Sequence, residues 1–82
     1  MKPHTITLAA NGRNVRLQHD TLSSYPRIVA HDHEGGWIGE LRDDEWGSGE
    51  IADFAREVVK TTGENIATNL RVILQTIDIL RR

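Results

Sequence analysis

The sequence predicts an α+β fold, in which two antiparallel β-hairpins form a three- or four-stranded sheet and two α-helices pack on one face of it. Three observations predict this. Alternating residues flank an early Asn-Gly pair, two further β-prone segments flank Glu-Gly-Gly, and apolar residues in the second half follow helical spacing. At 82 residues we expect a single domain, with hairpins over residues 1–42, a first helix over 48–62 and a second over 64–81.

The first hairpin is predicted by its turn. Asn11-Gly12 accepts the positive φ angles of a type I′ turn and lies between residues 4–10 and 13–19. A two-residue loop also fixes which side chains share the apolar face, because they alternate along a strand. The pairs placed opposite each other on that face are Leu8 with Val15, Ile6 with Leu17, and His4 with His19.

The second hairpin is predicted with an open register. Residues 27–33 are β-prone, and residues 37–41 are expected to pair back with them across Glu34-Gly35-Gly36. A loop of two, three or four residues fits this stretch, so the pairing is not fixed. The residues that we expect on its inner face are Ile28, Ala30, Trp37, Gly39 and Leu41.

The first helix is predicted from residue 48. Ser48 is a suitable N-cap, and Glu50 places a negative charge in the first turn, where the helix dipole favours it. The residues that follow the spacing of one buried stripe are Ile51, Phe54, Ala55, Val58 and Val59.

The second helix carries more apolar residues than one buried face needs. Its main stripe comprises Ile66, Leu70, Ile73, Ile77 and Leu80, and Ala67 and Leu74 widen it. Val72 and Ile79 lie on nearly the opposite side. Two interpretations follow: either the first helix covers these extra residues, or Val72 and Ile79 form the interface of a homodimer.

Several kinds of chemistry lack the residues that they require. The chain has no cysteine, and none of its serines lies in a nucleophile motif. His31 and His33 would share one face of a strand, but this spacing matches no zinc signature and predicts solvated histidines instead. His4 and His19 are expected at the open end of the first hairpin, without a catalytic role. We therefore expect a non-enzyme with no catalytic residue, no metal and no cofactor.

Charge is strongly segmented along the chain. The net charge is −2, but residues 1–31 carry +3, residues 32–57 carry −7 and residues 58–82 carry +2. The nine carboxylates of the central segment are Asp32, Glu34, Glu40, Asp43, Asp44, Glu45, Glu50, Asp53 and Glu57.

The acidic segment has two interpretations. Its charges either keep a turn soluble and protect a sheet edge, or form a surface for a basic protein partner, with a tryptophan as anchor. Direct nucleic-acid binding is not expected, because the arginines are scattered and the dense charge is negative. The candidate partner-binding residues are Glu40, Asp43, Asp44, Glu45, Trp46, Glu50 and Asp53.

Two resemblances accompany these features. A strand, then EGGWIGEL, then an amphipathic helix resembles the strand–Gly-Gly–strand–helix arrangement of HicB-type antitoxins, over about thirty residues. The proline-glycine turn of that family after the second strand is missing here. In size, acidity and lack of cysteine and catalytic equipment, the chain also resembles bacteriophage inhibitors such as anti-CRISPR proteins, a class without a shared motif.

Together these features predict a small protein-binding module. The most concrete expectation is an inhibitor whose acidic surface blocks a basic, nucleic-acid-binding partner. The alternative is a homo-oligomeric structural or regulatory module, antitoxin-like, assembled through the last helix. No run of about 18 apolar residues and no signal peptide is visible, so we expect no membrane association. The lack of cysteine fits a cytoplasmic protein.

Overall fold

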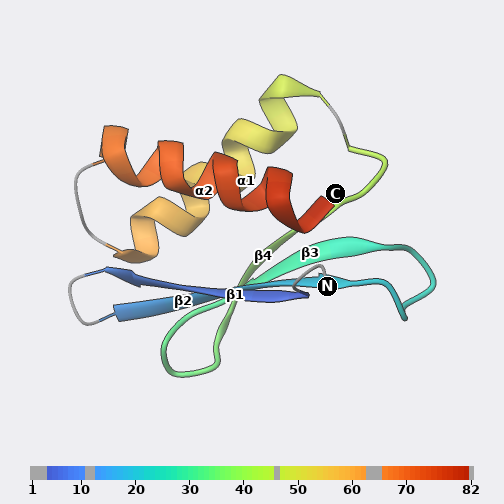
Figure 1. The fold of residues 1–82 in the computed structure, drawn as a ribbon, viewed down its shortest axis with the longest axis horizontal. Coiled ribbons are helices and arrows are strands. Elements are labelled where there is room, and N and C mark those ends of the chain that lie inside the picture. Colours follow the sequence, from blue (N-terminus) through green and yellow to red (C-terminus); the bar gives the residue numbers. More distant parts are fainter. Residues whose placement is uncertain (1–3, 11–12, 46, 63–65, 82) are drawn as a thin grey trace.

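The computed structural model describes residues 4–10, 13–45, 47–62 and 66–81, and it contains a four-stranded antiparallel sheet followed by two helices. The strands lie in the order of the sequence, and both helices cover one face of the sheet (Figure 1). This confirms the predicted α+β fold. The elements are β1 (Thr5–Ala10), β2 (Arg13–Asp20), β3 (Arg27–His31), β4 (Trp37–Arg42), α1 (Ser48–Thr62) and α2 (Ile66–Arg81).

The first hairpin has the predicted register. Ile6 pairs with Leu17 and Leu8 pairs with Val15, and the backbone N–H of His19 donates a 2.8 Å hydrogen bond to the carbonyl oxygen of His4. Within β2, Val15, Leu17 and His19 are buried, while the intervening residues face solvent. Asn11 and Gly12, which predicted the turn, lie outside the described residues.

The second hairpin contains a register shift that the sequence did not predict. Ile28 pairs with Leu41 and Ala30 with Gly39, and Ile28, Ala30 and Leu41 are buried as expected. Between Ala30 and His31 the register then changes by one residue, so that His31 pairs with Trp37. A β-bulge of this kind reverses the alternation of side chains beyond it.

Trp37 is therefore not part of the core, contrary to our prediction. Its side chain is 56% exposed, and it contacts the ring of His31 and the guanidinium of Arg27, with 5.6 Å between the Arg27 Cζ and the indole centroid. Ile38 packs against the core instead. The extra residue in β4 thus moves the tryptophan to the helix-free face of the sheet, by which we mean the face opposite the helices.

The loop between β3 and β4 comprises residues 32–36 and is longer than expected. Asp32 organises it, because its Oδ1 accepts hydrogen bonds from the backbone N–H groups of Glu34 (2.9 Å) and Gly36 (2.7 Å). Gly35 has a φ of 84°, a conformation that glycine adopts without strain. The Gly-Gly pair is therefore explained by the turn itself.

Helix α1 has the predicted bounds and a different N-cap. The N–H of Ile51 donates to the carbonyl of Gly47 (3.1 Å), and the Glu50 carboxylate accepts from the N–H of Gly47 (3.1 Å). Gly47, rather than Ser48, is thus the N-cap, and Glu50 supplies the reciprocal half of a capping box. The predicted stripe is buried at Phe54, Ala55, Val58 and Val59 and partly buried at Ile51.

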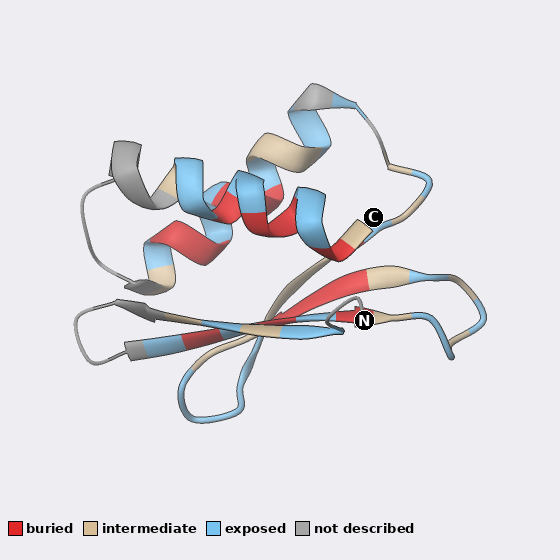
Figure 2. Cartoon of the chain, viewed as in Figure 1, coloured by how far each residue is buried: buried red, intermediate tan, exposed pale blue. Residues whose placement is uncertain are grey.

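Helix α2 packs on α1 and on β2. The buried faces of both helices point towards the sheet, where they meet the inner residues of the strands (Figure 2). Ile73, Ile77 and Leu80 are buried as predicted, but Leu74 is 40% exposed and does not widen the stripe. Over the described residues, no helix combines the length and the apolar character that crossing a bilayer requires.

The end of α2 is joined to the turn after β4. Nη2 of Arg81 donates hydrogen bonds to the carbonyl oxygens of Arg42 (2.6 Å) and Glu45 (3.4 Å), which are far away in sequence. This contact fixes the end of β4 relative to the helical layer, and it lies next to the acidic residues that follow β4.

Candidate functional site

An open groove lies between β4 and α1. Its apolar part is formed by Gly39, Leu41 and Phe54, and its volume is about 270 Å³. The ring of Phe54 lies close to the strand at Gly39: a Cβ at Gly39 would be 4.0 Å from Phe54 Cδ1, an ordinary van der Waals distance. The hollow is smaller than a typical pocket for a drug-sized ligand and is suited to one or two side chains of a partner.

Five carboxylate residues line this groove. On α1 the spacing of three and four residues places three of them on one side of the helix, facing β4. One comes from β4 and one from the turn between the two elements. We call this set the acidic groove: Glu40, Glu45, Glu50, Asp53 and Glu57.

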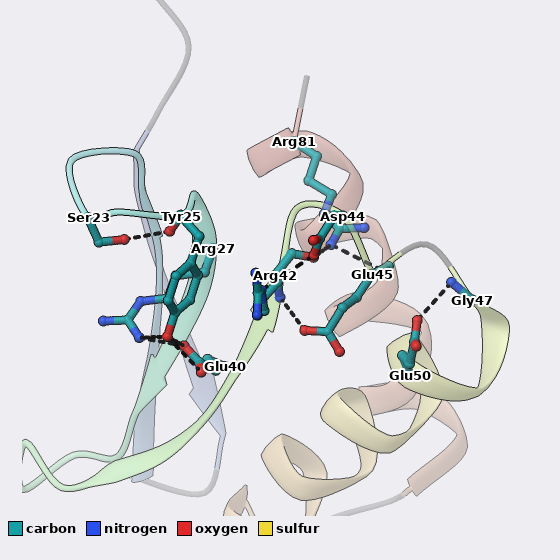
Figure 3. A network of polar contacts seen from close by, with 10 residues as sticks. All are labelled: Ser23, Tyr25, Arg27, Glu40, Arg42, Asp44, Glu45, Gly47, Glu50 and Arg81. Carbon is teal, nitrogen blue, oxygen red and sulfur yellow. Dashed lines mark hydrogen bonds and ion pairs between the residues drawn. The ribbon is translucent and has the colours of Figure 1, made fainter.

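Two of the groove carboxylates are oriented by backbone amides. Oε1 of Glu45 accepts a 3.0 Å hydrogen bond from the N–H of Arg42, and Glu50 caps α1 through Gly47 (Figure 3). Neither Glu45 nor Glu50 forms an ion pair with another residue in the described part of the chain. Both therefore retain their negative charge in a fixed position.

Two others form exposed ion pairs along the helix. Asp53 pairs with Arg56 (3.2 Å), and Glu57 pairs with Lys60 (3.3 Å). Exposed pairs of this kind contribute only about 0.3–0.5 kcal/mol to stability. A basic partner can therefore replace Arg56 and Lys60 at little cost.

Glu40 differs from the other four, because its carboxylate is engaged on the helix-free face. It forms an ion pair with Arg27 and accepts a hydrogen bond from the hydroxyl of Tyr25 (3.3 Å; Figure 3). The hydrogen bond to Glu40 raises the pKa of Arg27 above its ordinary value, so Arg27 is charged at every physiological pH. Glu40 therefore contributes its backbone to the groove more than the charge of its carboxylate.

The sequence did not predict this cluster on the helix-free face. The guanidinium groups of Arg27 and Arg42 lie over the ring of Tyr25, with Cζ 5.2 and 4.3 Å from its centroid. Tyr25 and Arg27 are separated by one proline, and Glu40 and Arg42 alternate on the opposing strand. A fixed register for the second hairpin would have placed these four side chains together.

The structure brings some of the predicted partner-binding residues together in one groove. Glu40, Glu45, Glu50 and Asp53 line the acidic groove, together with Glu57, which the i+4 spacing from Asp53 would have added. Of the remaining candidates, Asp43 contacts His19 (2.8 Å) and Asp44 forms an exposed pair with Arg42 (3.5 Å), and Trp46 lies outside the described residues.

The two predicted dimer residues are exposed on α2. Val72 is 40% and Ile79 is 38% exposed, and they lie along one flank of the helix, on either side of the buried Thr76. The hydroxyl of Thr76 donates to the carbonyl of Val72 (2.8 Å), which satisfies it within the helix. Val72 and Ile79 thus border the buried stripe instead of lying opposite to it.

The histidines lie apart from the acidic groove. His31 is the last residue of β3 and lies against Trp37, whereas His33 is in the following loop and contacts Glu34 (3.5 Å). Because the strand ends at His31, the two imidazoles do not share a strand face. Within residues 4–10, 13–45, 47–62 and 66–81, no three histidine or carboxylate side chains form a group that could hold a metal ion.

Comparison of the chain with protein-family models, with curated proteins and with solved structures gives no match.

Proposed function

We propose that this chain is a non-enzymatic protein-binding module, an inhibitor whose acidic groove binds the basic surface of a nucleic-acid-binding partner. The observation that carries the proposal is the groove itself, in which carboxylates surround an apolar floor. Charge alone is common on protein surfaces. A negative rim around an apolar hollow offers both attraction for a basic partner and area for a desolvated contact.

The arrangement supports inhibition by occupation of a site. A surface that binds phosphates is rich in lysine and arginine, and the same side chains are attracted to fixed carboxylates. Glu45 and Glu50 are held by backbone amides, so they lose little conformational freedom on binding. A partner that holds the acidic groove cannot hold phosphates with the same residues. The negative groove also makes direct binding of nucleic acid by this chain unfavourable.

The proposal is tested by affinity capture with matched charge variants. The groove variant carries Asp53→Lys and Glu57→Lys, and the control carries Glu34→Lys and Asp78→Lys, which change the net charge equally at exposed positions outside the groove. We expect the wild type and the control to capture a partner that the groove variant does not capture. In a mobility-shift assay, the wild-type chain should prevent this partner from binding nucleic acid. Equal capture by both variants would contradict the proposal.

A homodimer through α2 is a second candidate, favoured by the exposure of Val72 and Ile79. Two apolar side chains two turns apart on one flank provide the start of a self-complementary stripe, and a second copy would add core to a domain of marginal size. This role is compatible with partner binding, because the flank is on α2 and the groove is between α1 and β4.

Sedimentation tests the homodimer. The wild-type chain is expected at twice its mass of 9.2 kDa at micromolar concentration, and the double variant Val72→Glu with Ile79→Glu at the monomer mass. A wild-type chain that sediments as a monomer would eliminate this candidate and leave the groove proposal intact.

A further inference from the structure

Strand β4 forms one edge of the sheet. It pairs with β3 on one side, and no further strand of the described chain pairs with its other side. The N–H of Asp43 donates to the carbonyl of Pro26 (2.9 Å), so the backbone groups of Asp43 point towards β3. Along the strand, the backbone groups of successive residues point alternately towards β3 and away from it. By that alternation, the backbone groups of Glu40 and Arg42 point away from β3, out of the sheet edge.

The edge is closed at Arg42. Its N–H donates to the Glu45 side chain (3.0 Å), and its carbonyl accepts hydrogen bonds from the N–H of Glu45 (3.0 Å) and from Arg81 (2.6 Å). The turn and the end of α2 thus occupy the place of a neighbouring strand there. Edge strands are commonly protected in this way.

The edge is open two residues earlier, at Glu40. No group in the described part of the chain replaces a neighbouring strand there as Glu45 does at Arg42. The open position is also the one beside the acidic groove, since Gly39 and Glu40 line it together with Asp53 and Glu57 of α1. An unpaired donor and acceptor therefore adjoin an apolar hollow with a negative rim.

We propose that the open edge of β4 at Glu40 accepts an extended lysine- or arginine-rich segment of the partner as an added strand, with basic side chains in the acidic groove. This inference rests on the proposed function and specifies the form in which the partner binds. Backbone hydrogen bonds supply affinity in such strand addition, and pockets for alternate side chains supply specificity.

Charge complementarity selects this occupant. The aliphatic stem of a lysine or arginine covers Phe54 and Gly39 while its charged end reaches Asp53 and Glu57. A second copy of this chain does not suit the edge, because pairing β4 with β4 would bring two acidic grooves together, and like charges opposite each other are unfavourable.

The test measures fluorescence anisotropy at fixed ionic strength, with a labelled nine-residue peptide of alternating arginine and threonine. A second peptide with the same side chains carries an N-methyl group on every backbone amide, so it keeps its charge and loses its donors. We expect the methylated peptide to bind at least about tenfold more weakly. Equal affinity of the two peptides would overturn strand addition.

Protein variants separate this inference from the proposed function. Glu40→Pro removes the outward N–H without removing a bond to β3, and Glu40→Gln is its control for the lost charge; only the proline variant is expected to lose the unmethylated peptide. If the proline variant does not fold, the peptide pair still decides. If the variant with Asp53→Lys and Glu57→Lys binds neither peptide, and the wild-type chain binds both with equal affinity, then strand addition alone would be overturned. Unchanged affinity in that variant would overturn the proposed function as well.

Discussion

The imidazole of His19 lies against the carboxylate of Asp43, with Nε2 2.8 Å from Oδ2 and 3.1 Å from Oδ1. The two residues are 24 positions apart and join β2 to the turn after β4, across the strand that separates them in the sheet. The His19 side chain is only 7% exposed. Asp43 therefore satisfies a buried polar group, and the acid that we had assigned to partner binding has a structural role.

Asp43→Ala is expected to lower the free energy of unfolding by about 1–2 kcal/mol, because it leaves a buried ring nitrogen without its acceptor. Asp44→Ala is the control, since the Asp44 side chain is 72% exposed, and it is expected to change stability by less than about 0.5 kcal/mol. Urea denaturation measures both. Equal effects of the two variants would show that the His19 contact contributes nothing.

Gly36→Ala is expected to destabilise the β3–β4 loop by about 1–2 kcal/mol. A Cβ at this position would lie 2.7 Å from Asp32 Oδ2, and moving that carboxylate breaks the two hydrogen bonds that it accepts. Gly49→Ala is the matched control: nothing lies within 4 Å of its Cβ, and alanine suits the first turn of α1. Thermal unfolding should show a lower midpoint for the first variant and an equal or higher one for the second.

Trp37→Ala is expected to cost about 1 kcal/mol, because the indole is mostly exposed and loses mainly its contact with Arg27. Phe54→Ala is expected to cost about 3–5 kcal/mol, since its ring is buried in the core beneath the groove. Circular dichroism during urea titration compares them. A large loss of stability for Trp37→Ala would indicate that the tryptophan is part of the core and would contradict the register shift.

Substitutions at Glu50 separate its two roles. Glu50→Gln keeps an acceptor for the N–H of Gly47 and should preserve stability, whereas Glu50→Ala removes the cap and should cost about 1 kcal/mol. Both remove a groove charge, so both should weaken binding of the arginine-threonine peptide. Denaturation and anisotropy measurements on the same samples test this. Full peptide affinity in either variant would show that Glu50 is not part of the binding surface.

The sequence predicted those parts of the fold that depend on local pattern. The Leu8–Val15 pairing follows from an Asn-Gly turn and strict alternation, and the buried face of α1 follows from helical spacing. Trp37 was misplaced because a bulge depends on how the second hairpin packs under the helices, which local alternation does not contain. Leu74 was misplaced because the width of the buried stripe is set by the position of α1.

The sequence predicted the charge of the candidate site but not its shape. Four of the candidates in the acidic segment line one groove. The sequence could not show that Asp43 turns towards His19, since that contact requires β2 and the turn after β4 to be brought together. Nor could it show that β4 is an edge strand, which is a property of the sheet order.

The most direct test of the acidic groove as a binding site is a titration of the isotope-labelled chain with the arginine-threonine peptide, followed by amide chemical shifts. We predict the largest changes at Gly39 and Glu40 of β4 and at Asp53 and Glu57 of α1, with contacts between peptide backbone and the Glu40 amide. Largest changes on the exposed flank of α2 or on the helix-free face around Trp37, or no changes, would contradict the account.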